Sequence, residues 1–259
     1  MIEVEASIYD HPQYYDLIFA ADWEPEFNFL EACFEKYIDG NVKRLFEPAC
    51  GTGRLIYRFA DAGYEITGND LNAKAIDFCN ERLAQYGLQQ RAAVGDMTRF
   101  TLDHPVQAAF NTINSFRHLT TELQVVKHLN CMADAIETGG IYILGFHLSP
   151  TGIDACEEEY WSAEEDGIKV DSGMWLKERD TRRRIETLGM SFDVQTPDEK
   201  LRIVDEIKFR TYTWPQFERS IEKVPRLKLV DVYDFDYDIA NPRAIDQESE
   251  DAVFVFKVQ

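Results

Sequence analysis

The chain has 259 residues, of which 45% are hydrophobic and 13% are aromatic, and this composition excludes an intrinsically disordered protein. Lys and Arg total 27 against 47 Asp and Glu, so the formal net charge is -20, which argues against a nucleic-acid backbone as the partner. The first residues lack the basic and apolar regions of a signal peptide, and no apolar run reaches the roughly 18–20 residues of a transmembrane helix. We therefore expect a soluble, cytoplasmic protein with no membrane partner.

The cysteines are consistent with this compartment. Their number, five, is odd, and they lie far apart with no Cys-x-x-Cys pair and no histidine spacing typical of zinc. We expect reduced thiols and no metal site.

The first predicted element is an aromatic-rich segment at residues 8–34, which we expect to form a helical arm within residues 1–40. From residue 42 to 148, short apolar runs alternate with stretches whose apolar residues recur every three or four positions. This alternation predicts a parallel sheet with helices on both faces over residues 41–150. The expected strands are 42–49, 65–70, 91–96, 108–113 and 141–148, and the expected helices are 54–62, 73–86 and 121–137.

The pattern changes after Pro150. Strand-like segments at 169–178, 183–194 and 200–212 are separated by turn-forming residues, which predicts an antiparallel meander inserted at residues 151–213. A helix at 214–223 and strands at 228–235 and 252–258 follow, and we expect residues 214–259 to complete the first sheet. Two acidic clusters, 154–166 and 231–251, carry 14 of the 20 net negative charges, and we expect both to be loops.

The segment 46–54, Phe-Glu-Pro-Ala-Cys-Gly-Thr-Gly-Arg, joins the first strand of this sheet to its first helix. Gly51 and Gly53 have no Cβ, so the chain can turn sharply and a ligand can approach the backbone outside the strand's carboxyl end. Asp70 ends the next strand, where a carboxylate is placed to accept hydrogen bonds from ribose hydroxyls. These features predict a nucleotide-like ligand.

Two residues discriminate between possible cofactors. A dinucleotide site would have a third glycine at the position of Ile56, whose bulk disfavours close packing around a pyrophosphate. Glu47 would repel a pyrophosphate but could receive a cationic amine. An NAD-dependent oxidoreductase is therefore disfavoured, whereas S-adenosylmethionine brings an ammonium, a sulfonium and no phosphate.

These residues resemble the motifs of the class I S-adenosylmethionine-dependent methyltransferases. Residues 47–53 resemble the first motif, Asp70-Leu71 the ribose-binding acid with its neighbour, and Gly95-Asp96-Met97 the loop that holds adenine. The resemblance implies a Rossmann-like, seven-stranded α/β sheet with helices on both faces and an inserted antiparallel β meander. It also implies a set of cofactor-binding residues: Tyr15, Glu47, Ala49, Gly51, Gly53, Arg54, Asp70, Leu71, Asp96, Met97 and Asn114.

Within that class, the whole chain is similar to small-molecule N-methyltransferases of the amino-sugar type. The shared features are an arm that contains Tyr15-Asp16 and a loop after the fourth strand, here residues 114–119. The chain departs from the pattern at Ala49, which replaces a glycine, at Gln107 and Ala109, where an acid is usual, and at Arg117, which replaces a small residue beside the substrate. The last departure bears on the acceptor more than on the cofactor.

His118 is the candidate catalytic residue, because a histidine pKa suits proton removal from an amine or hydroxyl, although a surface or capping histidine is an equal alternative. We expect an enzyme, monomeric or homodimeric, that methylates a nitrogen or oxygen of a small-molecule acceptor and leaves S-adenosylhomocysteine. A protein or nucleic-acid methyltransferase is the main alternative, although Asn111-Thr112-Ile113-Asn114 stands where nucleobase amino-methylases have Asn/Asp-Pro-Pro-Tyr/Phe. An NAD-dependent oxidoreductase and a non-catalytic S-adenosylmethionine-binding protein are less favoured alternatives.

Overall fold

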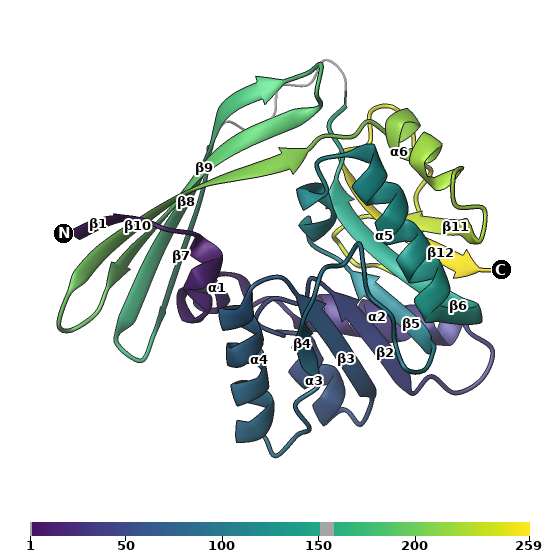
Figure 1. Cartoon of the computed structure of the whole chain (residues 1–259), viewed down its shortest axis with the longest axis horizontal. Coiled ribbons are helices and arrows are strands. Elements are labelled where there is room, and N and C mark those ends of the chain that lie inside the picture. The colour runs from purple at the N-terminus through teal and green to yellow at the C-terminus, as the bar shows by residue number, and fades with distance from the viewer. Residues whose placement is uncertain (1, 151–157) are drawn as a thin grey trace.

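A computed structural model of the protein describes residues 2–150 and 158–259, and these residues form two β-sheets (Figure 1). The larger sheet has seven strands in the order β11-β12-β6-β5-β2-β3-β4. Strands β4, β3, β2, β5 and β6 are parallel, and β12 and β11 return antiparallel. The strands are β2 (Arg44–Pro48), β3 (Glu65–Asp70), β4 (Ala92–Val94), β5 (Val106–Asn111), β6 (Ile136–His147), β11 (Leu227–Tyr233) and β12 (Asp251–Val258). The predicted fold class is confirmed.

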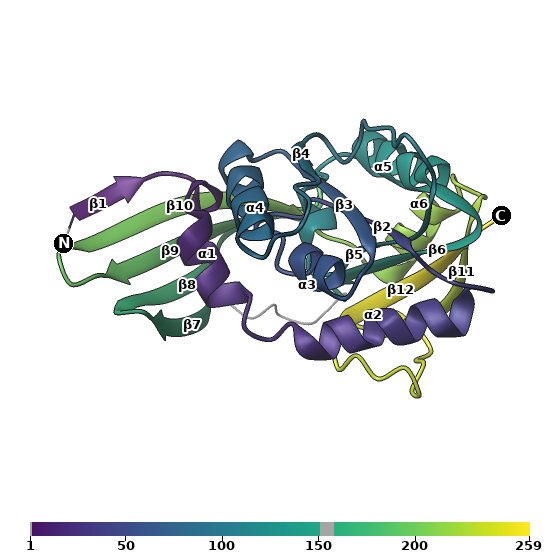
Figure 2. The same cartoon turned by 90° about the horizontal axis from the view of Figure 1, so that it is seen from below.

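Helices cover both faces of this sheet. One face packs against α2 (Glu24–Tyr37), α3 (Ile56–Asp61) and α4 (Ala73–Gln85), and the other against α5 (Glu122–Ala135) and α6 (Trp214–Ile221). Figure 2 shows α2 and α5 on opposite sides of the sheet. No helix among residues 2–150 and 158–259 is long and apolar enough to cross a membrane.

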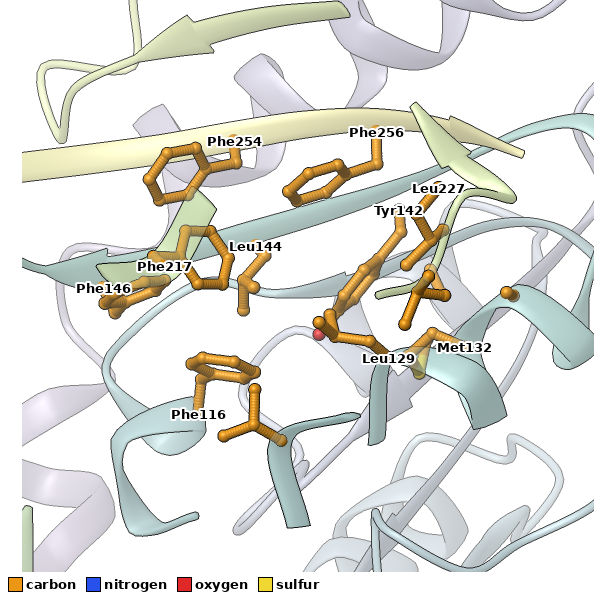
Figure 3. Close-up of a cluster of buried hydrophobic side chains, with 14 of the residues drawn as sticks. Phe116, Leu129, Met132, Tyr142, Leu144, Phe146, Phe217, Leu227, Phe254 and Phe256 are labelled. Carbon is orange, nitrogen blue, oxygen red and sulfur yellow. The ribbon is translucent and has the colours of Figure 1, made fainter. Parts of the chain in front are cut away.

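Strand β6 shows why both faces are buried. Tyr142, Leu144 and Phe146 belong to the cluster beneath α5 and α6, whereas the alternate residues Ile141 and Ile143 belong to the opposite cluster. Figure 3 shows the first three in contact with residues of α5, α6 and β12, including Leu129, Phe217 and Phe254. Burial of each such side chain contributes about 1.5–3 kcal/mol. Because both faces of the central strands are buried, these strands are continuous apolar runs in the sequence.

The smaller sheet has the order β1-β10-β9-β8-β7 and is antiparallel except for the β1–β10 pair. It consists of β1 (Ile2–Glu5), β7 (Glu158–Glu165), β8 (Ile168–Asp180), β9 (Ile185–Gln195) and β10 (Lys200–Arg210). Three of these strands form the predicted meander, and the other two, β1 and β7, correct the sequence-based expectation.

Strand β7 lies within the first acidic cluster, which we expected to be a loop. It pairs with β8 from Glu158 to Glu165, and as an edge strand it can expose its carboxylates to water. Residues 154–157 of that cluster, including Cys156, lie outside the described residues. Strand β1 lies in the segment expected to be helical, and its alternation of Ile2, Glu3, Val4 and Glu5 is the period of a strand.

The arm links the two sheets. It contains η1 (Ile8–Asp10) and α1 (Pro12–Phe19), and Figure 1 shows α1 between the smaller sheet and α4. Ile8 is fully buried, and its backbone N–H donates to Asp205 Oδ2 of β10 at 3.0 Å. On the other side, Asp16 forms an ion pair with Arg82 of α4. The division of the chain into four segments, 1–40, 41–150, 151–213 and 214–259, stays a prediction.

Candidate functional site

A cavity of about 1080 Å³ lies between the carboxyl ends of the larger sheet's strands, the arm and the smaller sheet. It opens beside β2, where the chain order switches from β3 on one side to β5 on the other, the usual ligand site of such sheets. Ten of the predicted site residues line it: Tyr15, Glu47, Ala49, Gly51, Arg54, Asp70, Leu71, Met97, Asn114 and His118. Gly53 and Asp96 are not among the described lining residues.

Asp70 ties the glycine-rich loop to the end of β3. Its Oδ2 accepts a hydrogen bond from the Gly51 N–H at 2.9 Å, and its Oδ1 accepts one from the Asn72 N–H at 2.8 Å. Burial raises the pKa of Asp70, and these backbone donors oppose that rise. Each carboxylate oxygen keeps a second lone pair, so Asp70 can still accept from a ligand hydroxyl.

The two motif glycines have different roles. Both have a left-handed backbone, with φ of +54° at Gly51 and +70° at Gly53. A Cβ at Gly51 would meet no atom within 4 Å, whereas one at Gly53 would lie 2.2 Å from Cys79 Sγ of α4. Gly51 therefore leaves room in the cavity, and Gly53 permits close packing of the loop against α4.

Buried acceptor atoms without partners mark the region where β2 and β5 end. Glu47 is 8% exposed and Asn111 is 3% exposed, and none of the described residues forms a hydrogen bond with Glu47 Oε2 or Asn111 Oδ1. The other amide atom of Asn111, Nδ2, donates to the carbonyl oxygen of Pro48 at 2.7 Å. Burial raises the pKa of Glu47 well above its usual value, partly opposed by Arg54. Because both residues line the cavity, a cationic or hydrogen-bond-donating ligand would satisfy these acceptors.

Arg54 is bound by a residue that the sequence analysis missed. It forms an ion pair with Glu26 of α2, which is fully buried and also accepts a hydrogen bond from Thr112 Oγ1. Burial lowers the pKa of Arg54, but the combined effect of Glu26 and Glu47 is larger, so the pKa is raised overall. The available signal was the spacing of Glu26 with Phe29 and Cys33, which places this acid on the buried stripe of α2.

Aromatic side chains of the arm form one wall of the cavity. The rings of Tyr9 and Tyr15 lie 5.4 Å apart, and Tyr15 also contacts Phe19 at 4.7 Å between centroids. Tyr9 Oη and His118 Nε2 form a hydrogen bond of 3.0 Å. Burial and the neighbouring Arg117 lower the pKa of His118 to about 4, while burial raises the pKa of Tyr15 to about 12. Both groups are therefore neutral near pH 7.

The loop after β4 is held from behind by α5. Met97 lines the cavity, and its carbonyl oxygen lies 3.0 Å from His128 Nδ1, while His128 Nε2 lies 2.8 Å from Tyr142 Oη. His128 is fully buried, and burial lowers its pKa to about 4. Asp96 accepts a hydrogen bond from the Thr98 N–H at 2.8 Å, which stabilises the turn, and its contact with the cofactor stays a prediction.

Asn114 lies at the opposite side of the cavity, after β5. Its backbone is left-handed, with φ of +58°, and its Oδ1 accepts a hydrogen bond from the His147 N–H at 3.0 Å. Asn tolerates this conformation better than most residues, which explains why the chain can turn here into η2 (Ser115–His118). The turn presents both Asn114 and His118 to the cavity.

The smaller sheet contributes the remaining wall. Its cavity-lining side chains are mostly apolar and include Trp161, Met174, Leu176, Leu188, Met190 and Phe209. Three charged residues that the sequence analysis did not name individually, Glu159, Arg179 and Glu186, interrupt this surface, and Arg117 of η2 contacts Glu186. The cavity thus has a polar end at the glycine-rich loop and a largely apolar end at the smaller sheet.

Comparison with known proteins agrees with this geometry. A family model described as "Methyltransferase domain" matches residues 46–140. YqeM of Bacillus subtilis (strain 168), which carries a provisional methyltransferase name, is 27% identical over 122 residues, 44% of this chain and 47% of that protein. The chain therefore spans about half the length of the curated relative that it matches.

Solved structures match over nearly the whole chain. An S-adenosylmethionine-dependent methyltransferase from Clostridium acetobutylicum ATCC 824 has a TM-score of 0.78 at 17% identity, covering 96% of this chain and 97% of its own. DesVI of Streptomyces venezuelae has a TM-score of 0.76 at 16% identity, and the match covers 99% of this chain and 100% of DesVI. The sugar N-methyltransferase KedS8 from Streptoalloteichus sp ATCC 53650 has a TM-score of 0.76 at 12% identity, and the match covers 99% of this chain and 94% of KedS8. The predicted fold is confirmed: the chain has the fold of these S-adenosylmethionine-dependent methyltransferases, and its residues 46–140 match the model of a methyltransferase domain.

Proposed function

We propose that this chain transfers a methyl group from S-adenosylmethionine to a nitrogen or oxygen of a small-molecule acceptor, and that it releases S-adenosylhomocysteine. A small acceptor is supported by the roof that the arm and smaller sheet form over the cavity, and by the net charge of -20, which disfavours nucleic acid. Two proteins of similar structure are the sugar N-methyltransferase KedS8 and CalS10, an amino pentose methyltransferase from Micromonospora echinaspora. The cytoplasmic location and a monomeric or homodimeric state stay predictions.

The observation that carries this proposal is a pair of buried acceptors, Glu47 Oε2 and Asn111 Oδ1, that have no hydrogen-bond partner within residues 2–150 and 158–259. An ammonium group has three donors and one positive charge, so it would satisfy an acceptor of this kind and relieve the cost of burying Glu47. A pyrophosphate would instead place negative charge against a carboxylate. The site therefore favours the amino-acid end of S-adenosylmethionine over a dinucleotide.

The remaining predicted residues suit the ribose and the purine of the cofactor. We propose that Asp70 accepts hydrogen bonds from the ribose hydroxyls, because its two oxygens each retain a lone pair. Leu71 lines the cavity although 73% of its surface is exposed, so a purine face would cover apolar surface there. Met97 provides a second apolar contact. Gly51 leaves the space in which the backbone can approach the ligand.

Bound S-adenosylmethionine supplies a methyl group on a sulfonium, which is already a good leaving group. The chain therefore has to align the acceptor and exclude water rather than provide a strong nucleophile of its own. Tyr9 and Tyr15 offer neutral phenols to this space, since burial raises the pKa of both. His118 is neutral and can accept a proton, but its pKa of about 4 makes it a weak base. We propose that it also orients Tyr9, and its catalytic role stays a prediction.

The test compares S-adenosylmethionine binding to wild type, Glu47→Gln and the control Glu137→Gln, which removes a half-exposed carboxylate that pairs with Arg44 and is not among the lining residues of the cavity. Loss of a charge-assisted hydrogen bond of about 1.5–3 kcal/mol should raise the Kd of Glu47→Gln roughly 10- to 150-fold. Adenosine lacks the amino-acid end, so its affinity should be unchanged in both variants. Equal losses for adenosine and S-adenosylmethionine would contradict this placement of the ligand.

Catalysis needs a separate readout. Incubation with S-adenosylmethionine and a panel of small amines and alcohols should yield S-adenosylhomocysteine with at least one acceptor. A protein that binds the cofactor but forms no product with small molecules, peptides or nucleic acids would be a non-catalytic binder. Binding of NADH in a fluorescence titration would instead support the oxidoreductase alternative.

A further inference from the structure

Two arginines share one carboxylate at the apolar end of the cavity. Arg117 Nη2 donates to Glu186 Oε2 at 2.7 Å, and Arg179 Nε donates to Glu186 Oε1 at 2.9 Å. All three residues line the cavity. Two guanidinium groups and one carboxylate leave one net positive charge in this cluster, which we call the arginine pair.

The arginine pair is fixed in place. Arg117 and Glu186 are 7% and 5% exposed, and Arg117 Nε also donates to the carbonyl oxygen of Arg210 at 3.1 Å. The Arg117 guanidinium lies 4.9 Å from the centroid of the Phe209 ring. Arg179 is the more accessible partner, with 30% of its side chain exposed. Side chains held in this way lose little further freedom when a ligand binds.

The positive charge is incompletely compensated. Within residues 2–150 and 158–259, neither Arg117 nor Arg179 has a hydrogen bond from Nη1. Burial lowers the pKa of Arg117 although Glu186 raises it, which agrees with a buried cation that one shared carboxylate does not fully stabilise. Leu176, Leu188 and Phe209 line the same end of the cavity, and apolar surroundings strengthen electrostatic contacts.

Among the residues that the structure describes, the other carboxylates that line the cavity do not supply this compensation. Asp16 pairs with Arg82, and Glu47 and Asp70 lie at the glycine-rich end. Glu250 and Asp251 line the cavity but are exposed, and no ion pair joins either of them to the arginine pair. Glu159 lines the cavity from the edge strand β7, and no ion pair joins it to the arginine pair. Since none of the carboxylates described in the structure pairs with the arginine pair apart from Glu186, an oxyanion on the ligand would balance the remaining charge.

We propose that the methyl acceptor carries an oxyanion, a carboxylate or a phosphate, that binds Arg179 and Arg117, on an apolar body that packs against Met174, Leu188 and Phe209. The guanidinium fork suits both oxyanions, because each offers two oxygens to two N–H groups. The proposal rests on the proposed function, since it assigns the space left beside the cofactor to the acceptor.

The experiment measures binding of three matched probes to the full chain saturated with S-adenosylhomocysteine, by ligand-observed NMR. The probes are phenylacetate, phenyl phosphate and the neutral phenylacetamide. At least one anion should bind 10-fold or more tightly than the amide, and the stronger anion identifies the carboxylate or the phosphate as the preferred group. Equal binding of all three, or no binding of either anion at millimolar concentration, would overturn the proposal.

Variants locate the effect. Arg179→Gln should reduce anion binding at least 10-fold, and Arg179→Lys should keep part of it because the charge remains. Arg202→Gln is the matched control, since Arg202 lies on β10 of the same sheet, pairs with Asp193 and is not among the lining residues. An unchanged affinity in Arg179→Gln, with native circular dichroism, would refute the site. S-adenosylhomocysteine binding is measured in parallel: its absence in wild type would refute the proposed function, whereas its presence without anion binding would refute the arginine pair alone.

Discussion

Alanine at Gly51 and at Gly53 should damage the protein in different ways. Both substitutions force a left-handed residue, which costs roughly 1–2 kcal/mol for a side chain with a Cβ. At Gly51 no atom lies within 4 Å of the new Cβ, so the free energy of unfolding should fall by only that amount. Because Gly51 lines the cavity, the added methyl group should also raise the Kd for S-adenosylhomocysteine.

At Gly53 the new Cβ would lie 2.2 Å from Cys79 Sγ and 3.2 Å from Cys79 Cβ. Cys79 is 1% exposed, so relief requires movement within a packed helix, and such overpacking costs about 1–3 kcal/mol. The total, roughly 2–5 kcal/mol, is a large part of the stability of an ordinary domain.

Urea unfolding of Gly51→Ala, Gly53→Ala, Cys79→Ala and the Gly53→Ala/Cys79→Ala double variant measures these terms, and calorimetry gives the Kd of each. The double variant should recover about 1–3 kcal/mol relative to the sum of its single changes, because Sγ is removed from the clash. Equal instability of the two glycine variants would refute the assignment of different roles. An additive double-variant cycle would refute the contact with Cys79.

Two further predictions follow from the pKa shifts. Glu47→Gln should stabilise the ligand-free protein, and the gain should be larger at pH 8 than at pH 5. Burial raises the pKa of Glu47 in the folded state, so the wild type loses stability as the pH rises from the pKa of Glu47 in the unfolded chain toward its pKa in the folded protein. Urea unfolding at both pH values checks this, and a larger gain at pH 5 would contradict it. His118→Ala should lower kcat/KM through loss of the Tyr9 contact without altering its pH dependence between pH 6 and 8, because the pKa of His118 is about 4. A wild-type inflection near pH 6.5 that is lost in the variant would restore His118 as the titrating base.

Local sequence patterns were sufficient for the central sheet and the cofactor loop. The strands of the larger sheet are apolar runs buried on both faces, and Gly51, Asp70 and Met97 lie at strand ends that the parallel arrangement brings together. Such features depend on neighbours within a few residues, which is why the expected strand 65–70 coincides with β3 (Glu65–Asp70).

The missed features depend on partners that are distant in sequence or on the position of a strand in its sheet. Glu186 meets Arg179 only through the register of the β8–β9 hairpin and meets Arg117 only through the contact between the two sheets. The periodicity of α2 places Glu26 on the buried stripe, but its partners Arg54 and Thr112 are distant in sequence and are identified only by the fold. Strand β7 was read as a loop because charge argues against a buried strand but not against an edge strand.

The segment that is recognisable in sequence is smaller than the unit that folds, because the arm and the final strands complete the sheet and the cavity. A fragment cut to residues 46–140 would lack α2, most of β6, and β12, so part of the apolar surface on each face of the sheet would be exposed to water. It would also lack Asp10, whose Oδ1 accepts a hydrogen bond from Asn72 Nδ2 at 2.8 Å, two residues after Asp70, the proposed ribose-binding acid. Transplanting the methyltransferase signature into another scaffold would therefore carry the motif without the side chains that keep it in shape.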